Sequence, residues 1–249
     1  MPHFFINSND VTENIAKITD RENLNHIVKS LRTKNGEKLL LIDENKIQYE
    51  TIIQDISKDL IVSKIIKSYP SKRFLDFDLY LAQSPLRSDS QTFIMEKATE
   101  LGVKGVYPVY TDNCALKKDV ITKKIEKWQK TMFEASKQCE RAFIPKCFEL
   151  TTIQRLVADE KFDKIIAFCE RITDKTLREC FMETPLKKSE KVLVIIGPEG
   201  GFSDREFEFF KNSNIEMLTL GDLILKAETA VIVGLGNIIY EYTNQNKNI

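Results

Sequence analysis

Cysteine and histidine are scarce in this chain of 249 residues. It has five cysteines, none in a Cys-x-x-Cys pair, and two histidines, His3 and His26. An odd number of cysteines without paired spacing argues against a disulfide scaffold, and so few histidines argue against a zinc site. Neither histidine lies beside a nucleophile motif, so a catalytic triad is not expected either. We therefore expect no metal and no histidine-based catalysis.

Long apolar runs are missing as well. No stretch approaches the roughly 20 apolar residues that a membrane span needs. The first residues do not combine a basic segment with a long apolar one, as a signal peptide would. The 37 basic and 37 acidic side chains cancel, and 42% of the residues are hydrophobic. This composition is typical of a soluble globular protein, which we expect to be cytoplasmic and without a membrane partner.

Two kinds of pattern follow one another along the chain. Up to residue 70, short β-rich runs predict a small barrel or sandwich that one helix interrupts. After a linker at residues 69–72, strands alternate with helices, which predicts an α/β domain with a mainly parallel sheet. The early strands are expected at 37–43, 46–53 and 60–66, and the early helix at 23–31. The later strands are expected at 75–82, 103–109, 164–168, 191–196 and 216–220, and the later helices at 90–101, 120–140, 203–212 and 227–242.

The strongest local motif is a glycine-rich loop that follows the apolar strand 191–196. It reads Gly197-Pro198-Glu199-Gly200-Gly201-Phe202-Ser203, and Ser203 and Glu206 have the spacing of a capping box at the start of a helix. Glycines at the carboxyl end of a parallel strand let the backbone approach a ligand closely. The loop is neither a P-loop nor a dinucleotide fingerprint, and Glu199 would repel a phosphate. A tight turn without a ligand is the alternative that the glycines alone leave open.

A second glycine-bearing loop follows the next strand. The strand ends at Leu220-Gly221, and Leu223, Ile224, Leu225 and Lys226 precede the last helix. The three apolar residues are compatible with ordinary core packing. Two successive strands that both end in glycine-bearing loops nevertheless indicate one shared cleft.

Basic residues gather in the middle of the chain, where residues 71–147 have 14 basic against 10 acidic side chains. In the helix expected at 120–140, apolar residues from Ile121 to Cys139 form one buried stripe. The opposite face carries Lys123, Lys127, Lys130, Lys137 and, just beyond, Arg141. A basic ridge of this kind binds phosphates electrostatically, although a solvated helix face is the more frequent meaning of such a run.

Taken together, these segments resemble the RsmE family, the 16S ribosomal RNA (uracil-N3) methyltransferases of the SPOUT superfamily. The resemblance covers essentially the whole chain, and the two glycine-bearing loops near the C-terminus are its most specific part. Its further segments are 4–5, 26–32, 96–103, 134–139 with Arg141, and Pro145. The chain departs from the family pattern at His3 and Lys226, where arginine is usual, and in the loop 87–91.

The resemblance implies a PUA-like β-barrel over residues 1–70 and a SPOUT α/β domain with a deep trefoil knot over residues 73–249. It also implies S-adenosylmethionine as cofactor, a homodimer, and 16S ribosomal RNA of the small ribosomal subunit as partner. The cofactor residues would be Ile196, Gly197, Pro198, Glu199, Gly200, Gly201, Leu220, Gly221, Ile224, Leu225 and Thr229.

The expected reaction needs a group that removes the N3 proton of uracil and a cation that stabilises the resulting anion. Arg87, Lys226 and Arg141 are candidates for the cation, and Glu228 or Glu199 for the proton acceptor. His26 and Arg32 are candidates for RNA contacts. Two alternatives remain open: a SPOUT methyltransferase that modifies another RNA nucleotide, and a non-enzymatic RNA-binding factor in ribosome assembly.

Overall fold

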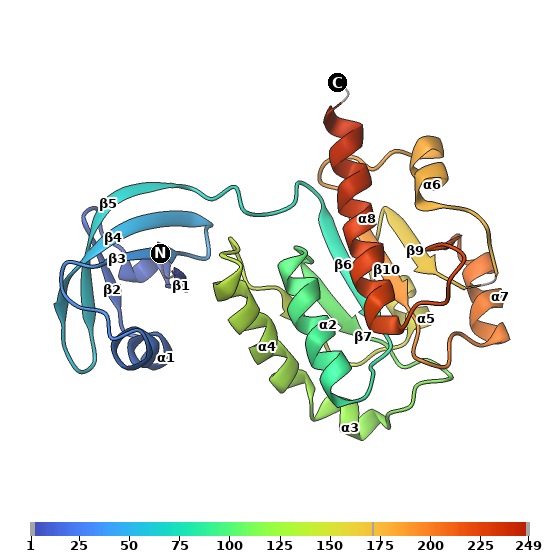
Figure 1. Cartoon of the computed structure of the whole chain (residues 1–249), viewed down its shortest axis with the longest axis horizontal. Coiled ribbons are helices and arrows are strands. Elements are labelled where there is room, and N and C mark those ends of the chain that lie inside the picture. Colours follow the sequence, from blue (N-terminus) through green and yellow to red (C-terminus); the bar gives the residue numbers. More distant parts are fainter. Residues whose placement is uncertain (1–2, 171, 248–249) are drawn as a thin grey trace. The chain divides into compact units, whose positions relative to one another are not determined.

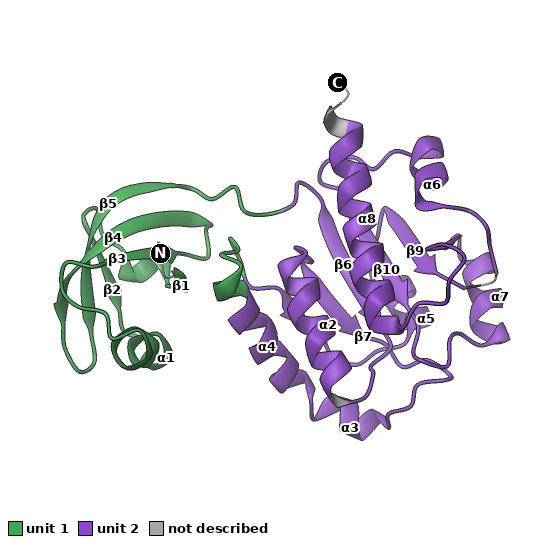
Figure 2. Cartoon of the chain, in the orientation of Figure 1, with its two compact units in different colours: residues 1–74, 136–143 green, residues 75–135, 144–249 purple. Residues whose placement is uncertain are grey.

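The computed structural model describes residues 3–170 and 172–247, and its chain forms two compact units (Figure 2). The N-terminal unit comprises residues 1–74 and 136–143, and the C-terminal unit comprises residues 75–135 and 144–249. The domain limits expected from the sequence, 1–70 and 73–249, stay a prediction. No feature of the sequence indicates that residues 136–143 lie with the N-terminal unit.

The N-terminal unit is built on a curled five-stranded sheet with the order β1-β3-β4-β5-β2 (Figure 1). β1 runs parallel to β3, and the other neighbours are antiparallel. Two irregularities in the β4–β5 register let these long strands bend. The strands are β1 (His3–Phe5), β2 (Ile15–Ile18), β3 (Lys38–Ile42), β4 (Ile47–Ile56) and β5 (Ile61–Pro70).

A short helical segment closes one end of this sheet. It consists of α1 (Arg21–Asn25) and a π-helical turn, η2 (His26–Ser30), and buries Leu24 and Ile27 in the core. The three expected strands and the expected helix are confirmed. The strands β1 and β2, of three and four residues, were not predicted.

His3 lies in β1 and is only 5% exposed. Burial, reinforced by the positive charge of Arg73, lowers the pKa of His3 from 6.5 to about 4, while the main chain of Lys137 acts in the opposite direction. A neutral imidazole is therefore part of the folded N-terminal unit.

Mild acid is expected to destabilise the protein through His3. The unfolded chain binds this proton near pH 6.5, whereas the folded chain resists until about pH 4, so stability is complete above the window and falls as the pH drops through it. Between about pH 7.5 and about pH 5 the loss should be about 2 kcal/mol. Denaturant titrations at both pH values measure it. An equal loss in a His3→Leu variant would contradict this assignment.

The C-terminal unit contains a six-stranded, fully parallel sheet with the order β11-β9-β10-β6-β7-β8. From β6 the sheet continues to one side with β7 and β8, whereas β10, β9 and β11 lie on the other side. The strand order therefore reverses between β6 and β10. In parallel sheets ligands bind at the carboxyl edge near such a reversal. The strands are β6 (Asp78–Gln83), β7 (Gly105–Pro108), β8 (Lys146–Cys147), β9 (Lys164–Phe168), β10 (Lys191–Ile196) and β11 (Glu216–Leu218).

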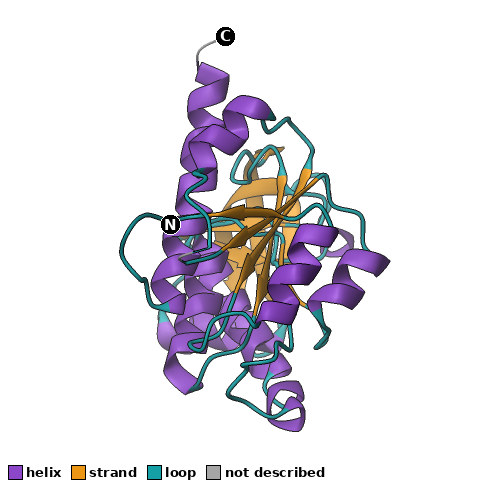
Figure 3. Ribbon diagram, turned by 90° about the vertical axis from the view of Figure 1, so that its right-hand side faces the viewer, coloured by secondary structure: helices purple, strands orange, loops and turns teal. Residues whose placement is uncertain are grey.

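Helices cover both faces of this sheet (Figure 3). One face packs against α2 (Ser88–Glu100), α4 (Ile125–Gln138), α6 (Leu177–Glu183) and α8 (Ala227–Lys247), and the other against α5 (Ile153–Asp159) and α7 (Asp204–Asn212). Coverage of both faces explains why β10 is apolar along nearly its whole length. Among the described residues, no helix is both long and apolar enough to cross a bilayer.

The expectation of a single helix at 120–140 was wrong. Two helices occupy this stretch, α3 (Lys118–Thr122) and α4, with a turn at Lys123 and Lys124 between them. The apolar repeat continues across the turn because Ile121 and Trp128 pack into the same core. An unbroken repeat in the sequence therefore concealed a break in the backbone.

Candidate functional site

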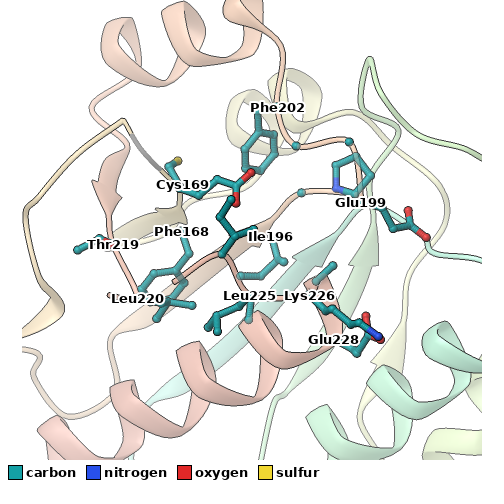
Figure 4. A pocket seen from close by; sticks show the side chains of 18 of the residues that line it. Phe168, Cys169, Ile196, Glu199, Phe202, Thr219, Leu220, Leu225, Lys226 and Glu228 are labelled. Carbon is teal, nitrogen blue, oxygen red and sulfur yellow. The ribbon is translucent and has the colours of Figure 1, made fainter. Parts of the chain in front are cut away.

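A cavity of about 590 Å³ opens at the carboxyl ends of β9, β10 and β11. Three loops line it together with the start of α8 (Figure 4), through residues 169, 170 and 172, residues 197–202, and residues 219–221 and 223–226. Its volume falls within the range of small-molecule sites, roughly 300–1,000 Å³. The shared cleft expected from the two glycine-bearing loops is thus present, and a third loop contributes to it.

The glycine loop after β10 is held in a definite shape. The Gly201 N–H donates to the Pro198 carbonyl at 3.0 Å, and Gly201 has a φ of +68°, which favours glycine. At the end of the loop the predicted capping box is confirmed, since Ser203 and Glu206 bond to each other's main chain. Glu206 is 3% exposed, so the start of α7 is anchored in the protein.

The loop after β11 presents apolar side chains to solvent. Leu223 is 81% exposed and Ile224 is 54% exposed, and both line the cavity. The alternative that they are ordinary core residues is therefore wrong. Gly221 has a φ of +115°, a conformation that side chains rarely adopt, and this turn gives the loop its course. Exposed apolar side chains around a cavity mark a surface that a ligand or partner covers.

Most of the expected cofactor residues lie together at this cavity. Ten of the eleven line it, and the exception is Thr229, which is exposed in the first turn of α8. Of the three expected catalytic residues, Lys226 and Glu228 line the cavity, whereas Arg87 does not. Arg87 is exposed and directly precedes α2.

The end of β9 supplies a wall that the sequence analysis missed. Phe168, Cys169 and Glu170 line the cavity, and no glycine marks this strand end as a ligand loop. Burial raises the pKa of Cys169 to about 12, so this thiol remains protonated and is a packing group rather than a nucleophile. The only available signal was the position of the strand in a parallel sheet.

The cavity has an apolar end and an acidic lining. Phe168, Leu220 and Leu225 gather at one end in Figure 4. Among the residues that the structure describes, three carboxylates, from Glu170, Glu199 and Glu228, and one lysine also line it. Glu228 accepts a long hydrogen bond of 3.5 Å from the Ser90 hydroxyl of α2. This lining suits a ligand that combines a flat apolar group with a positive centre.

The residues expected to bind RNA do not form one continuous surface. Lys123, Lys127 and Lys130 are exposed at the end of α3 and on α4, but Lys137 is 8% and Arg141 is 5% exposed. The expectation of a single exposed ridge of five was therefore wrong. The helical repeat was extended beyond the point at which the chain passes into the N-terminal unit.

Arg141 packs its guanidinium 4.5 Å from the centre of the Phe143 ring, and burial lowers the pKa of Arg141 to about 10. Both residues belong to the N-terminal unit, as do the other two RNA candidates. His26 packs edge-on against Phe4, with ring centres 5.6 Å apart. Arg32 is exposed with a φ of 54°. RNA contacts by these side chains stay a prediction.

Two family models match the chain. The model described as an RNA methyltransferase domain covers residues 74–239, and the model described as an RNA methyltransferase PUA domain covers residues 18–66. Two curated relatives are named ribosomal RNA small subunit methyltransferase E. The one from Mesomycoplasma hyopneumoniae is 31% identical over 93% of this chain and 96% of its own. The one from Bacillus subtilis is 28% identical over 88% of each chain.

Solved structures show the same fold. A putative methyltransferase from Legionella pneumophila, in complex with bound cofactor SAM, is 26% identical, with a TM-score of 0.82 over 95% of this chain and 96% of its own. A ribosomal RNA small subunit methyltransferase E from Neisseria gonorrhoeae, bound to S-adenosyl methionine, is 21% identical, with a TM-score of 0.81 over 96% of each chain.

Proposed function

Because this chain belongs to the ribosomal RNA small subunit methyltransferase E family, we propose that it methylates N3 of one specific uridine in 16S ribosomal RNA. It is a methyltransferase that uses S-adenosylmethionine and acts on ribosomal RNA. The observation that carries the finer proposal is the cavity. Two glycine-bearing loops line it together with a candidate cation, Lys226, and a candidate proton acceptor, Glu228.

The cavity fits S-adenosylmethionine. Its apolar end, with Phe168 and Leu225, suits the adenine, and its carboxylates suit the positively charged sulfonium. A side chain at Gly197 would meet the Phe202 ring at 3.3 Å, so the loop is packed closely behind the cavity wall. When bound, the cofactor supplies a methyl group on sulfur that needs no metal or acid to activate it.

The protein's own task is to prepare the nucleophile. N3 of uracil carries a proton at neutral pH and attacks only after losing it. We propose that Glu228, which faces the cavity from the first turn of α8, accepts this proton. Lys226 would stabilise the negative charge that remains on the uracil oxygens. Arg87, which does not line the cavity, stays a candidate for a further cationic contact. Because N3 lies on the base-pairing edge, the target uridine must be unpaired.

Several wider features rest on the same family membership. We propose that the loops of the cavity form a trefoil knot and that the protein works as a homodimer. The exposed Leu223 and Ile224 at the rim support an interface there. The PUA-like unit would bind the RNA of the small ribosomal subunit, and a ribosomal substrate would be met in the cytoplasm.

Methyl transfer tests the proposal directly. Small ribosomal subunits that lack the modification are incubated with labelled S-adenosylmethionine, and the product is mapped by mass spectrometry. A single N3-methyluridine in 16S RNA is expected. Methylation of another nucleotide would instead support a SPOUT enzyme of different specificity. If the protein neither binds the cofactor nor transfers a methyl group, the result would support the non-enzymatic assembly factor.

The exposed lysines of α3 and α4 allow a separate test of RNA binding. The triple replacement of Lys123, Lys127 and Lys130 with alanine should weaken binding to 16S RNA and reduce its salt dependence. The slope of log K against log salt is expected to fall by about two to three, at somewhat less than one per lost phosphate contact. Replacement of the exposed Lys187 and Lys188 on the same unit is the control. An unchanged slope in the triple variant would remove this surface from the RNA interface.

A further inference from the structure

The loop of residues 110–116, here called the brace loop, is hydrogen-bonded to the glycine loop from outside the cavity. It joins β7 to α3 and contributes no residue to the cavity lining. At its base the Thr111 and Ser84 hydroxyls are hydrogen-bonded at 2.6 Å, and both side chains are buried. Because Ser84 directly follows β6, the brace loop is anchored to the end of a central strand.

Asp112 connects the brace loop to the start of α7. Its carboxylate accepts a hydrogen bond from the Ser203 hydroxyl at 2.5 Å and pairs with the Arg205 guanidinium, and these two contacts lower the pKa of Asp112. Its main-chain N–H donates to the buried Glu206 carboxylate at 3.1 Å. The brace loop is therefore hydrogen-bonded to the segment in which the glycine loop ends and α7 begins.

Asn113 contacts the glycine loop itself. Its side-chain amide donates to the Gly200 and Gly201 carbonyls, each at 3.2 Å. A methyl group added at Gly200 would lie only 3.1 Å from the Asn113 Cβ, so the two backbones are already in close approach. One side chain thus determines the direction of two successive carbonyl groups in the loop.

The direction of these carbonyls fixes the rest of their peptide groups. In a trans peptide the N–H points opposite to the carbonyl, and the described chain has no cis bond. With the Gly201 carbonyl turned toward Asn113, the Phe202 N–H points away from the brace loop. Within the described residues this N–H makes no protein hydrogen bond. Gly200, Gly201 and Phe202 all line the cavity.

We propose that Asn113 is a positioning residue for the cofactor. Its amide holds the Gly200 and Gly201 peptide groups in the orientation that the bound cofactor needs, without touching the cofactor itself. Since S-adenosylmethionine is the ligand, the inference rests on the proposed function. Asn113 sets the affinity for the cofactor and leaves the chemical step unchanged.

The test measures binding of S-adenosylmethionine by calorimetry to the full-length protein and to three variants. Asn113→Ala removes the donor and should raise Kd about fivefold, the effect of one to two exposed hydrogen bonds. Asn113→Asp keeps the shape but turns an acceptor toward two carbonyls, so its Kd should rise further. Asn212→Ala, at the exposed last residue of α7, is the matched control and should bind like the wild type.

A kinetic comparison separates positioning from mere folding support. In Asn113→Ala the KM for S-adenosylmethionine should rise with Kd, while kcat and the thermal unfolding midpoint stay near the wild-type values. Wild-type Kd in Asn113→Ala would overturn the inference, and so would wild-type Kd in Asn113→Asp, since a packing role needs only the shape. A wild-type protein that binds no S-adenosylmethionine would overturn the proposed function as well.

Discussion

Replacing Lys226 with alanine is expected to lower kcat for methyl transfer about a hundredfold, the usual effect of losing one group that stabilises a developing anion. Lys226 lies just before α8, and its side chain lines the cavity beside that of Glu228 (Figure 4). Negative charge develops on the uracil oxygens as N3 loses its proton. Without the ammonium group, that charge has no cationic partner from this loop.

Single-turnover rates and calorimetry together make this test specific. The Kd for S-adenosylmethionine should stay within about twofold, because the lost interaction belongs to the transition state. Lys226→Arg should retain part of the rate, since the charge remains while the donor geometry changes. Lys161→Ala, at an exposed position of the same unit, is the control. Wild-type turnover in Lys226→Ala would remove this residue from the mechanism.

Gly234→Ala is expected to destabilise the C-terminal unit by about 3 kcal/mol. Gly234 is buried in α8, and a methyl group there would lie 2.6 Å from the ring of Phe168. Phe168 is 7% exposed and has little room to move. Because this ring also lines the cavity, the variant should bind S-adenosylmethionine more weakly as well as unfold at lower denaturant concentration.

The neighbouring Gly236 provides a matched control on the same helix. A methyl group at this position meets nothing within 4 Å. Gly236→Ala should therefore stabilise the protein by about 0.5–1 kcal/mol, because alanine loses less backbone entropy than glycine in a helix. Equilibrium unfolding of both variants gives the comparison. Similar effects of the two replacements would show that helix propensity, and not the contact with Phe168, decides the outcome.

The sequence predicted the parts of the fold whose patterns are long or local. The apolar run of β10 and the Ser203–Glu206 capping box are signals within a few residues, and the structure confirms both. Short strands were missed for the opposite reason, as β1 and β8 contain only three and two residues. Pairing with a neighbouring strand stabilises such a short strand, and this pairing leaves no periodic pattern in the sequence.

The candidate site divides along the same line. Its two glycine-bearing loops could be predicted, because a glycine directly after a predicted strand is a local signal in the sequence. The wall from Phe168 to Glu170 and the brace loop have no such mark. Lys137 and Arg141 show the reverse error, since a correct helical spacing gave no information about which segment passes into the other unit.

The sequence alone thus determined the class of the protein, the alternation of strands and helices, and the two glycine-bearing loops that line the cavity. These properties depend on residue type and on spacing along the chain. Only the tertiary structure decided which third loop completes the cavity, which basic residues are exposed, and which side chain holds the glycine loop. Each of these depends on contacts between segments far apart in the chain, such as Asn113 with Gly200. Such contacts form only when the parallel sheet brings its strand ends to one edge.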